Sequence, residues 1–308
     1  MASSNTERFD QRYEAVDRWP AHELVSGALA IQQEALRAVA AATEALAEAI
    51  VVLAARLQRG GRMVYAGAGS SGLIAQMDAL EMPGTFGIDL DRVPVILAGG
   101  AEALRTLPSG VEDDIGAAEA AVDRLDVNAD DGLVAVAASG STPFTLAALR
   151  RARARGAATI GIACVANSPL LSECHHPILI ETPPELIAGS TRMGAGTAQK
   201  CALNILSTGV ATRLGHVYAG LMVNMRPENA KLKHRAIQIV SQAADVGQGT
   251  AERALVETNW SVKTAIVMCA AAVDAGAARE RLAASGGHIH AALSQGPAAH
   301  GPRQGIGS

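Results

Sequence analysis

Two short hydroxyl-rich stretches carry the residues best suited to hold an anion. The first, 67–72, reads GAGSSG, and the second, 138–143, reads ASGSTP. Each follows an apolar run typical of a buried strand and opens a stretch typical of a helix. Each therefore places backbone N–H groups and hydroxyls at a helix N-terminus, where a phosphate binds well. We expect the phosphate to contact Gly69, Ser70, Ser71, Ser139, Gly140, Ser141 and Thr142.

The spacing Gly67-x-Gly69-x-x-Gly72 is also that of dinucleotide-binding loops. A dinucleotide site requires an acidic residue at the end of the second strand, where this sequence instead has LAGG at 97–100. A tight glycine turn or a serine N-cap would explain either stretch alone. Two such stretches after two strands favour a phosphorylated sugar, and we expect no cofactor.

Two glutamates are candidates for proton transfer. Glu81 lies in the apolar stretch ALEMP, and Glu112 lies in the acidic stretch GVEDD. Solvation or helix capping commonly explains such a glutamate, and the pattern alone does not select these two. The apolar neighbours of Glu81 predict that it is desolvated, which favours the protonated form that a general acid needs. Pro83 predicts that the helix containing Glu81 ends near residue 82.

A third stretch, 185–200, reads ELIAGSTRMGAGTAQK and leads into another predicted helix. Small polar residues with one arginine are typical of a loop that closes over an anion, and Glu185, Ser190 and Arg192 are its candidate contacts. The neighbouring pair His175-His176 follows Cys174, but adjacent residues of an extended chain point in opposite directions. We interpret these histidines as structural and expect no metal site.

The composition excludes several classes of protein. The 308 residues carry a net charge of −4, which argues against a nucleic-acid partner, and 49% are apolar, which is ample for a core. No apolar run is long enough to span a bilayer, and residues 1–10 lack the apolar core of a signal peptide. The four cysteines form no CxxC pair, as in reduced cytosolic proteins. We therefore expect a cytoplasmic protein without a membrane partner.

Short apolar runs alternate with helical stretches between residues 62 and 213. The runs, near 63–66, 93–98, 133–137, 159–163 and 178–180, predict a doubly wound parallel five-stranded sheet in an α/β domain. Helices over 22–58 precede it and an all-helical region follows it. We expect an N-terminal arm and helices over 1–58, a sheet domain over 59–220, a helical domain over 221–295 and a disordered tail over 296–308.

These residues together resemble the N-acetylmuramic acid 6-phosphate etherases, which have the sugar-isomerase (SIS) fold. The motifs that carry the resemblance are Thr6-Glu7, GAGSSG, Asp78-Ala79-x-Glu81-x-Pro83, AGG at 98–100, Glu112-Asp113, ASGSTPF, GSTRMGAGTAQK at 189–200 and Asn204-x-x-Ser207-Thr208. GSTRMGAGTAQK is the most specific, and the glucokinase regulatory protein, a non-catalytic relative, shares it. The resemblance implies a lyase of cell-wall amino-sugar recycling that removes a D-lactyl ether, with Glu81 as acid, Glu112 as base and neither metal nor nucleotide.

Six positions differ from the family's usual residues, and two of them, Asp10 and Tyr13, stand near the start where asparagine and serine are usual. Leu73 and Ser141 stand where arginine is usual, Gly194 where lysine is usual and Ala101 where glutamate is usual. These differences leave open an SIS-type isomerase or lyase acting on another sugar phosphate. The regulatory relative leaves open a non-catalytic sensor of sugar phosphates.

The length of the helix that carries Glu81 predicts a homodimer. Ser71 and Glu81 are about 15 Å apart along a helix that rises 1.5 Å per residue, which exceeds the length of a hexose phosphate. Either Glu81 acts on a phosphate held by another chain or the sugar reaches back across the helix. We favour the first, a homodimer with the site at the interface of two subunits.

Overall fold

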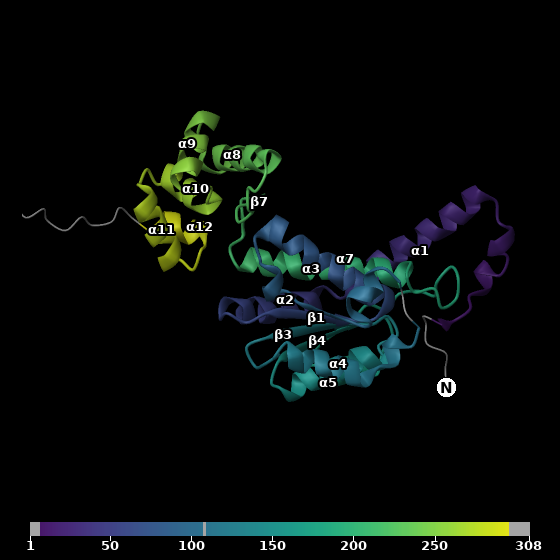
Figure 1. The fold of residues 1–308 in the computed structure, drawn as a ribbon. Helices are drawn as coiled ribbons and strands as arrows, with labels where there is room; N and C mark the ends of the chain where they lie inside the picture. Colours follow the sequence, from purple (N-terminus) through teal and green to yellow (C-terminus); the bar gives the residue numbers. More distant parts are fainter. Residues whose placement is uncertain (1–6, 107–108, 296–308) are drawn as a thin grey trace, which may run out of the picture. The chain divides into compact units, whose positions relative to one another are not determined.

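The computed structural model describes residues 7–106 and 109–295 and divides into two compact units (Figure 1). Within the described residues, the first unit runs to Met82 and resumes from Ile88 to Arg213. The second contains Pro83–Gly87 and continues from Leu214. The sequence placed this boundary slightly later, near residue 220. The expected tail, 296–308, lies outside the described residues.

A parallel sheet forms the centre of the first unit. Its strands are β1 (Met63–Gly67), β2 (Val95–Leu97), β3 (Gly132–Val136), β4 (Ala158–Ala163) and β5 (His176–Leu179). Their order is β2-β1-β3-β4-β5, and each neighbouring pair is parallel. β1, β3 and β4 are buried along their whole length, because helices cover both faces of the sheet. The predicted five-stranded α/β fold is confirmed.

Helices cover the sheet on two sides (Figure 1). The helices of this unit are α1 (Ala21–Ala41), α2 (Thr43–Gln58), α3 (Gly69–Phe86), α4 (Ile115–Arg124), α5 (Pro143–Ala154), α6 (Pro169–Glu173) and α7 (Gly194–Arg213). α4 and α5 pack together on one face, where Phe144 and Leu149 join Leu133 and Val64 in one core. α2 packs against the strands on the other side and contacts α7, which also contacts α1.

The expected end of α3 at Pro83 is wrong, because the helix continues to Phe86 with the proline inside it. Proline removes a single N–H donor, and the next turn still closes. The Gly87 N–H donates to the Pro83 carbonyl at 3.0 Å. The last turn of α3 therefore belongs to the second unit.

The second unit is a small helical bundle. Its helices are α8 (Ala230–Ala244), α9 (Gln248–Glu257), α10 (Val262–Ala270), α11 (Ala275–Ala284) and α12 (Ile289–Ser294). Their apolar faces form a separate core around Val240, Leu255 and Ile266. An all-helical region was expected from residue 221, but a hairpin of β6 (Val217–Tyr218) and β7 (Leu221–Met222) precedes α8. Its turn residues Ala219 and Gly220 both have positive φ, as tight hairpin turns require.

No single helix among residues 7–106 and 109–295 is long and apolar enough to cross a membrane. Taken together, α1 and α2 are long and apolar enough for a membrane span, but the chain bends by 61° between them.

Candidate functional site

The two hydroxyl-rich loops begin side by side at one edge of the sheet. Gly67, the last residue of β1, pairs with Val136, the last residue of β3. Neighbouring strands lie about 4.8 Å apart. The loops that follow therefore start next to each other at the carboxyl ends of the strands, where ligands bind in this class of sheet. The prediction that each stretch follows a buried strand and opens a helix is confirmed.

Glycines allow the first loop to turn tightly into α3. Gly69 begins the helix with φ of +51°, which favours glycine. A Cβ on Gly72 would lie 2.7 Å from the carbonyl oxygen of Gly67 and 2.5 Å from Cδ1 of Leu97. Only glycine permits this approach of helix to strand. The loop therefore presents the first N–H groups of α3 together with the partly exposed side chains of Ser70 and Ser71.

The second loop has the same plan. Gly140 has φ of +65°, and a Cβ there would collide with Ser168. The backbone N–H of Ser141 donates to Oγ of Ser139 at 3.2 Å, which shapes the turn. Thr142 is the N-cap residue of α5, but its side chain makes no capping hydrogen bond. Helix capping therefore does not account for the hydroxyl of Thr142.

The third stretch meets both loops. The carboxylate of Glu185, 1% exposed, accepts hydrogen bonds from the backbone N–H groups of Gly194 and Ala195, both at 2.9 Å. Ala195 in turn lies in one small buried cluster with Cys164 and with Ala138 of the second loop. Glu185 thus fixes the start of α7 beside that loop. Arg192 is exposed just before the helix.

Ser190 is partly exposed in the same segment, where its N–H donates to the carbonyl of Ile187 at 2.9 Å. Farther along α7, Gln199 accepts a hydrogen bond from Oγ of Ser71 at 2.9 Å. The α7 segment therefore touches the first loop as well as the second.

A buried carboxylate holds α3 against α7. Asp78, 3% exposed, accepts hydrogen bonds from the hydroxyl of Tyr65 at 2.6 Å, the amide of Asn204 at 2.6 Å and the hydroxyl of Ser207 at 3.0 Å. Burial, and then the charge and hydrogen bond of Asp78, raise the pKa of Tyr65 well above its usual value. Asp78 precedes Glu81 by three residues, so this network fixes the helix turn from which Glu81 projects.

Both candidate glutamates are exposed in the single chain, and the 3₁₀ helix that carries Glu112 contacts α5, the helix that follows the second loop. Glu81 is exposed on α3, and Glu112 is exposed in the short 3₁₀ helix Val111–Asp113. The desolvation predicted for Glu81 is wrong for a single chain. Its apolar neighbour Leu80 is itself 55% exposed, because this side of the helix faces outward.

Comparison with known proteins identifies the family. The model of the SIS domain matches residues 29–164. An N-acetylmuramic acid 6-phosphate etherase of Deinococcus radiodurans is 43% identical over 293 residues, which are 95% of this chain and 96% of the relative. The chain belongs to the N-acetylmuramic acid 6-phosphate etherase family. Another etherase, of Streptomyces coelicolor, is 42% identical over 294 residues, covering 96% of this chain and 94% of its own.

Solved structures similar to this etherase-family chain include two phosphoheptose isomerases. The one from Francisella tularensis is 22% identical with a TM-score of 0.46, covering 62% of this chain and 100% of its own. The one from Neisseria gonorrhoeae is 19% identical with a TM-score of 0.46, covering 62% of this chain and 98% of its own.

Asp78 and Gln199 lie in the etherase-family motifs, but their sequence context predicts no role for either residue. The side-chain nitrogen of Gln199 is buried without a partner among the described residues, although its oxygen bonds Ser71. A buried donor beside a predicted phosphate loop is a candidate ligand contact. The sequence does contain a feature that could have indicated a role for Asp78, because this carboxylate stands in the middle of an apolar helix.

The histidines have structural partners. His175 lies 3.0 Å from the hydroxyl of Thr159, and His176 lies 2.9 Å from the carboxylate of Glu48. Within residues 7–106 and 109–295, no group of three or more His, Cys, Asp or Glu is placed to hold a metal ion. The four cysteines are free thiols.

Proposed function

We propose that this chain cleaves the D-lactyl ether of N-acetylmuramic acid 6-phosphate, giving N-acetylglucosamine 6-phosphate and D-lactate. The observation that carries the proposal is the meeting of two hydroxyl-bearing loops with the start of α7 at one edge of the sheet. Membership of the etherase family supplies the choice of substrate.

The loops suit a phosphate dianion. The helices α3 and α5 begin at these loops, and their first N–H groups point toward an anion placed there. The hydroxyls of Ser70, Ser71, Ser139, Ser141 and Thr142 add further donors, and Arg192 lies exposed before α7. A dianion accepts many such bonds, and those from charged donors are the strongest.

The reaction is an elimination followed by a hydration. In the open-chain sugar, the aldehyde acidifies the proton on C2, and the carboxylate of Glu112 removes that proton. The electron pair forms the C2–C3 double bond as the C3–O bond breaks, and the carboxyl of Glu81 protonates the departing lactate oxygen. The carboxylate of Glu81 then takes a proton from water as the hydroxyl adds to C3, and Glu112 returns its proton to C2, which restores both glutamates. No cofactor enters this sequence.

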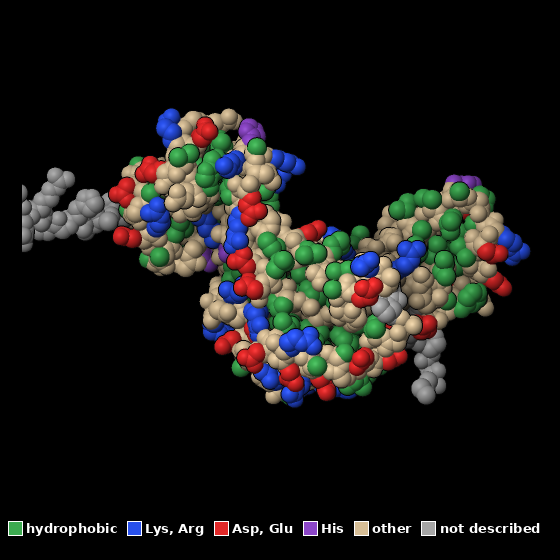
Figure 2. All heavy atoms as spheres, in the orientation of Figure 1, with side chains coloured by type: hydrophobic (Ala, Val, Ile, Leu, Met, Phe, Trp, Pro, Cys, Tyr) green, Lys and Arg blue, Asp and Glu red, His purple; other side chains and the backbone are tan. Residues whose placement is uncertain are grey.

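A second copy of the chain would complete the site. Glu81 lies about 15 Å along α3 from Ser71, farther than a hexose phosphate reaches. The side of α3 that carries it also exposes Met77 and Leu80, by 40% and 55%. On α7, Ile205 lines an apolar groove of about 710 Å³. Figure 2 shows that hydrophobic side chains lie on the surface of this unit, and a dimer would bury such an area.

We place the reaction in the cytoplasm, in recycling of cell-wall amino sugars. The four free cysteines suit a reducing compartment. The substrate is a diffusible sugar phosphate, and neither nucleic acid nor membrane takes part.

Lactate release from N-acetylmuramic acid 6-phosphate tests the activity. We expect Glu81→Gln and Glu112→Gln each to lower the rate by about 10²- to 10⁴-fold, the usual contribution of a general acid or base. Glu119→Gln, at an exposed position of α4, is the control and should leave the rate unchanged. No release by the natural chain would reject the etherase. Deuterium exchange at C2 without elimination would identify an isomerase, and stabilisation by the ligand without turnover would identify a sensor.

Mixing inactive variants tests the shared site. Glu81→Gln keeps the phosphate loops, and Ser139→Asp places a repelling charge in one of them. If Glu81 serves the phosphate of the partner, hybrid dimers contain one intact site. Activity should then return to about a quarter of the natural rate, since half of randomly formed dimers are hybrids with one site each. No recovery, or a monomer in sedimentation at micromolar concentration, would contradict the shared site.

A further inference from the structure

The second unit contains a pocket of its own, which we call the Lys263 pocket. It has a volume of about 470 Å³ and is lined by Asn224, Arg226, Glu228, Trp260, Ser261 and Lys263, with neighbouring residues of the same unit. This volume falls in the usual range of small-molecule sites. The etherase chemistry proposed above uses none of these residues.

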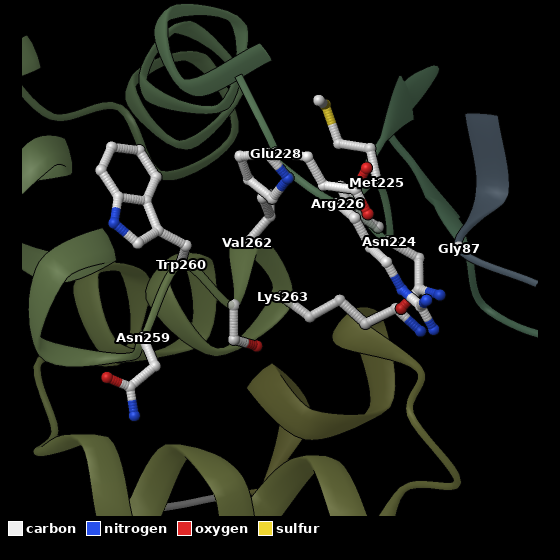
Figure 3. Close-up of a pocket in the computed structure, with 12 residues that line it drawn as sticks. Gly87, Asn224, Met225, Arg226, Glu228, Asn259, Trp260, Val262 and Lys263 are labelled. Atoms are coloured by element: carbon white, nitrogen blue, oxygen red, sulfur yellow. The ribbon is translucent and has the colours of Figure 1, made fainter. Parts of the chain in front are cut away.

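Nitrogen atoms gather at one end of the pocket. In Figure 3 the side chains of Asn224, Arg226 and Lys263 extend toward the same end, and the indole of Trp260 lies at the other. The amide nitrogen of Asn224 donates to the carbonyl of Phe86 at 2.8 Å and lies 3.4 Å from Nδ1 of His216, and these two partners hold the side chain in place. Glu228 is the acidic residue of the lining and is exposed.

Partial burial of the positive charge of Lys263 is unfavourable, and a bound anion would offset that cost. It is half-buried and has no ion pair within the part of the chain that the structure describes, and burial lowers its pKa to about 8. Burial, and then the charge of Lys263, lower the pKa of the neighbouring His216 to about 4. A bound anion would relieve both effects, because an opposite charge favours the protonated forms.

The wall that carries Trp260 has an uncommon backbone. Asn259 and Trp260 have φ of +51° and +62°, two successive residues in a region that favours glycine. The amine of Lys233 lies 4.9 Å from the centre of the indole ring. Strained backbone of this kind clusters at ligand sites, where it fixes a side chain in a required orientation.

We propose that the Lys263 pocket binds a small phosphate ester, with the phosphate at Arg226 and Lys263 and the carbon skeleton against Trp260. A hexosamine 6-phosphate has the required charge and a ring to pack on the indole. This site is separate from the phosphate loops of the sheet, and its occupancy does not depend on the proposed etherase activity.

The two tryptophans of the chain allow a direct test. Trp260 lines the pocket, and Trp19 packs edge-on against Tyr13 in the other unit, 6.0 Å between ring centres. The indole N–H resonances of the full chain are followed by NMR during titration with glucosamine 6-phosphate. We expect the Trp260 resonance to shift and saturate, and we expect inorganic phosphate to bind more weakly and glucosamine not at all. An unmoved Trp260 resonance would overturn the proposal.

Variants of the full chain complete the test. Lys263→Gln should weaken binding about tenfold or more, since a hydrogen bond to a charged group is lost. Lys263→Arg should keep binding, and Arg279→Gln, which removes an exposed cation of α11, should not change it. Equal affinity of Lys263→Gln and the natural chain would overturn the role of Lys263. Equal affinity for inorganic phosphate and for the ester would overturn the role of Trp260.

Discussion

Replacing Asp78 by alanine should destabilise the first unit strongly. The change removes one buried carboxylate that accepts three hydrogen bonds, from Tyr65, Asn204 and Ser207. The hydroxyl of Tyr65 would then be left inside the protein without an acceptor. Ser207 retains a longer bond to the carbonyl of Asn204 at 3.3 Å.

The magnitude follows from these bonds. A hydrogen bond to a charged group contributes about 1.5–3 kcal/mol, and an unsatisfied buried group costs about 1–3 kcal/mol. Because Asn204 can turn to water and Ser207 keeps another acceptor, we expect a total loss of about 4 kcal/mol in the free energy of unfolding. At about 2–4 °C per kcal/mol for a unit of this size, the melting temperature should fall by roughly 8–16 °C.

Urea unfolding followed by circular dichroism measures the loss. Asp91→Ala, at an exposed position, is the control and should change stability by less than about 0.5 kcal/mol. In a double-mutant cycle, Asp78→Ala with Tyr65→Phe should give a coupling of about 1–3 kcal/mol. A loss below about 1 kcal/mol, or no coupling to Tyr65, would refute the assigned role of this network.

Three further predictions concern a glycine, an ion pair and a thiol. Gly72→Ala should lower the free energy of unfolding by about 1–3 kcal/mol, measured by thermal unfolding, because the new Cβ would lie 2.5 Å from a leucine methyl of β2. Gly84→Ala, in the same helix with no atom within 4 Å of its Cβ, should not destabilise, and equal losses would contradict the packing. Burial acts to raise the pKa of Asp131, but hydrogen bonds from Arg62 and from backbone N–H groups outweigh it and hold that pKa below its usual value. The stabilisation that ionised Asp131 gives the folded protein should therefore be complete above about pH 3.9 and be lost as the pH falls further. Asp131→Asn should make the free energy of unfolding fall less steeply with decreasing pH below that value. An unchanged pH dependence would count against the ion pair of Asp131 and Arg62. Burial raises the pKa of Cys164 to about 12, so this thiol should resist alkylation at pH 8 until the protein unfolds. Peptide mass mapping would measure the labelling, and rapid labelling of Cys164 in the folded protein would disprove the prediction.

The sheet was predictable because its strands carry their own signal. Leu133–Val136 and Ile160–Ala163 are apolar at nearly every position, as only strands covered on both faces can be. The position of both hydroxyl-rich loops follows from the same fact, since loops after parallel strands share one edge. Local rules failed at Pro83, where a single missing N–H did not outweigh the bonds that close the next turn.

The remainder of the site depends on residues far apart in the sequence. Asp78 bonds Asn204 and Ser207, which are 126 and 129 positions away, and no local pattern indicates such a pair. The apolar neighbours of Glu81 predicted burial, but hydrophobic residues beside a carboxylate equally mark a surface that a second chain covers. Sequence does not distinguish a core from an interface, because both exclude water by the same chemistry.

The end of α3 has a consequence for fragments of this protein. The helix begins at the first hydroxyl-rich loop, carries Glu81, and finishes with residues 83–86 inside the C-terminal bundle, where Asn224 holds the carbonyl of Phe86. Deleting the chain beyond Arg213 should therefore leave the last turn of α3, next to Glu81, without the residues that it contacts. The bundle and the sheet are not interchangeable modules, and a chimera that exchanges the bundle must also exchange those few residues far upstream.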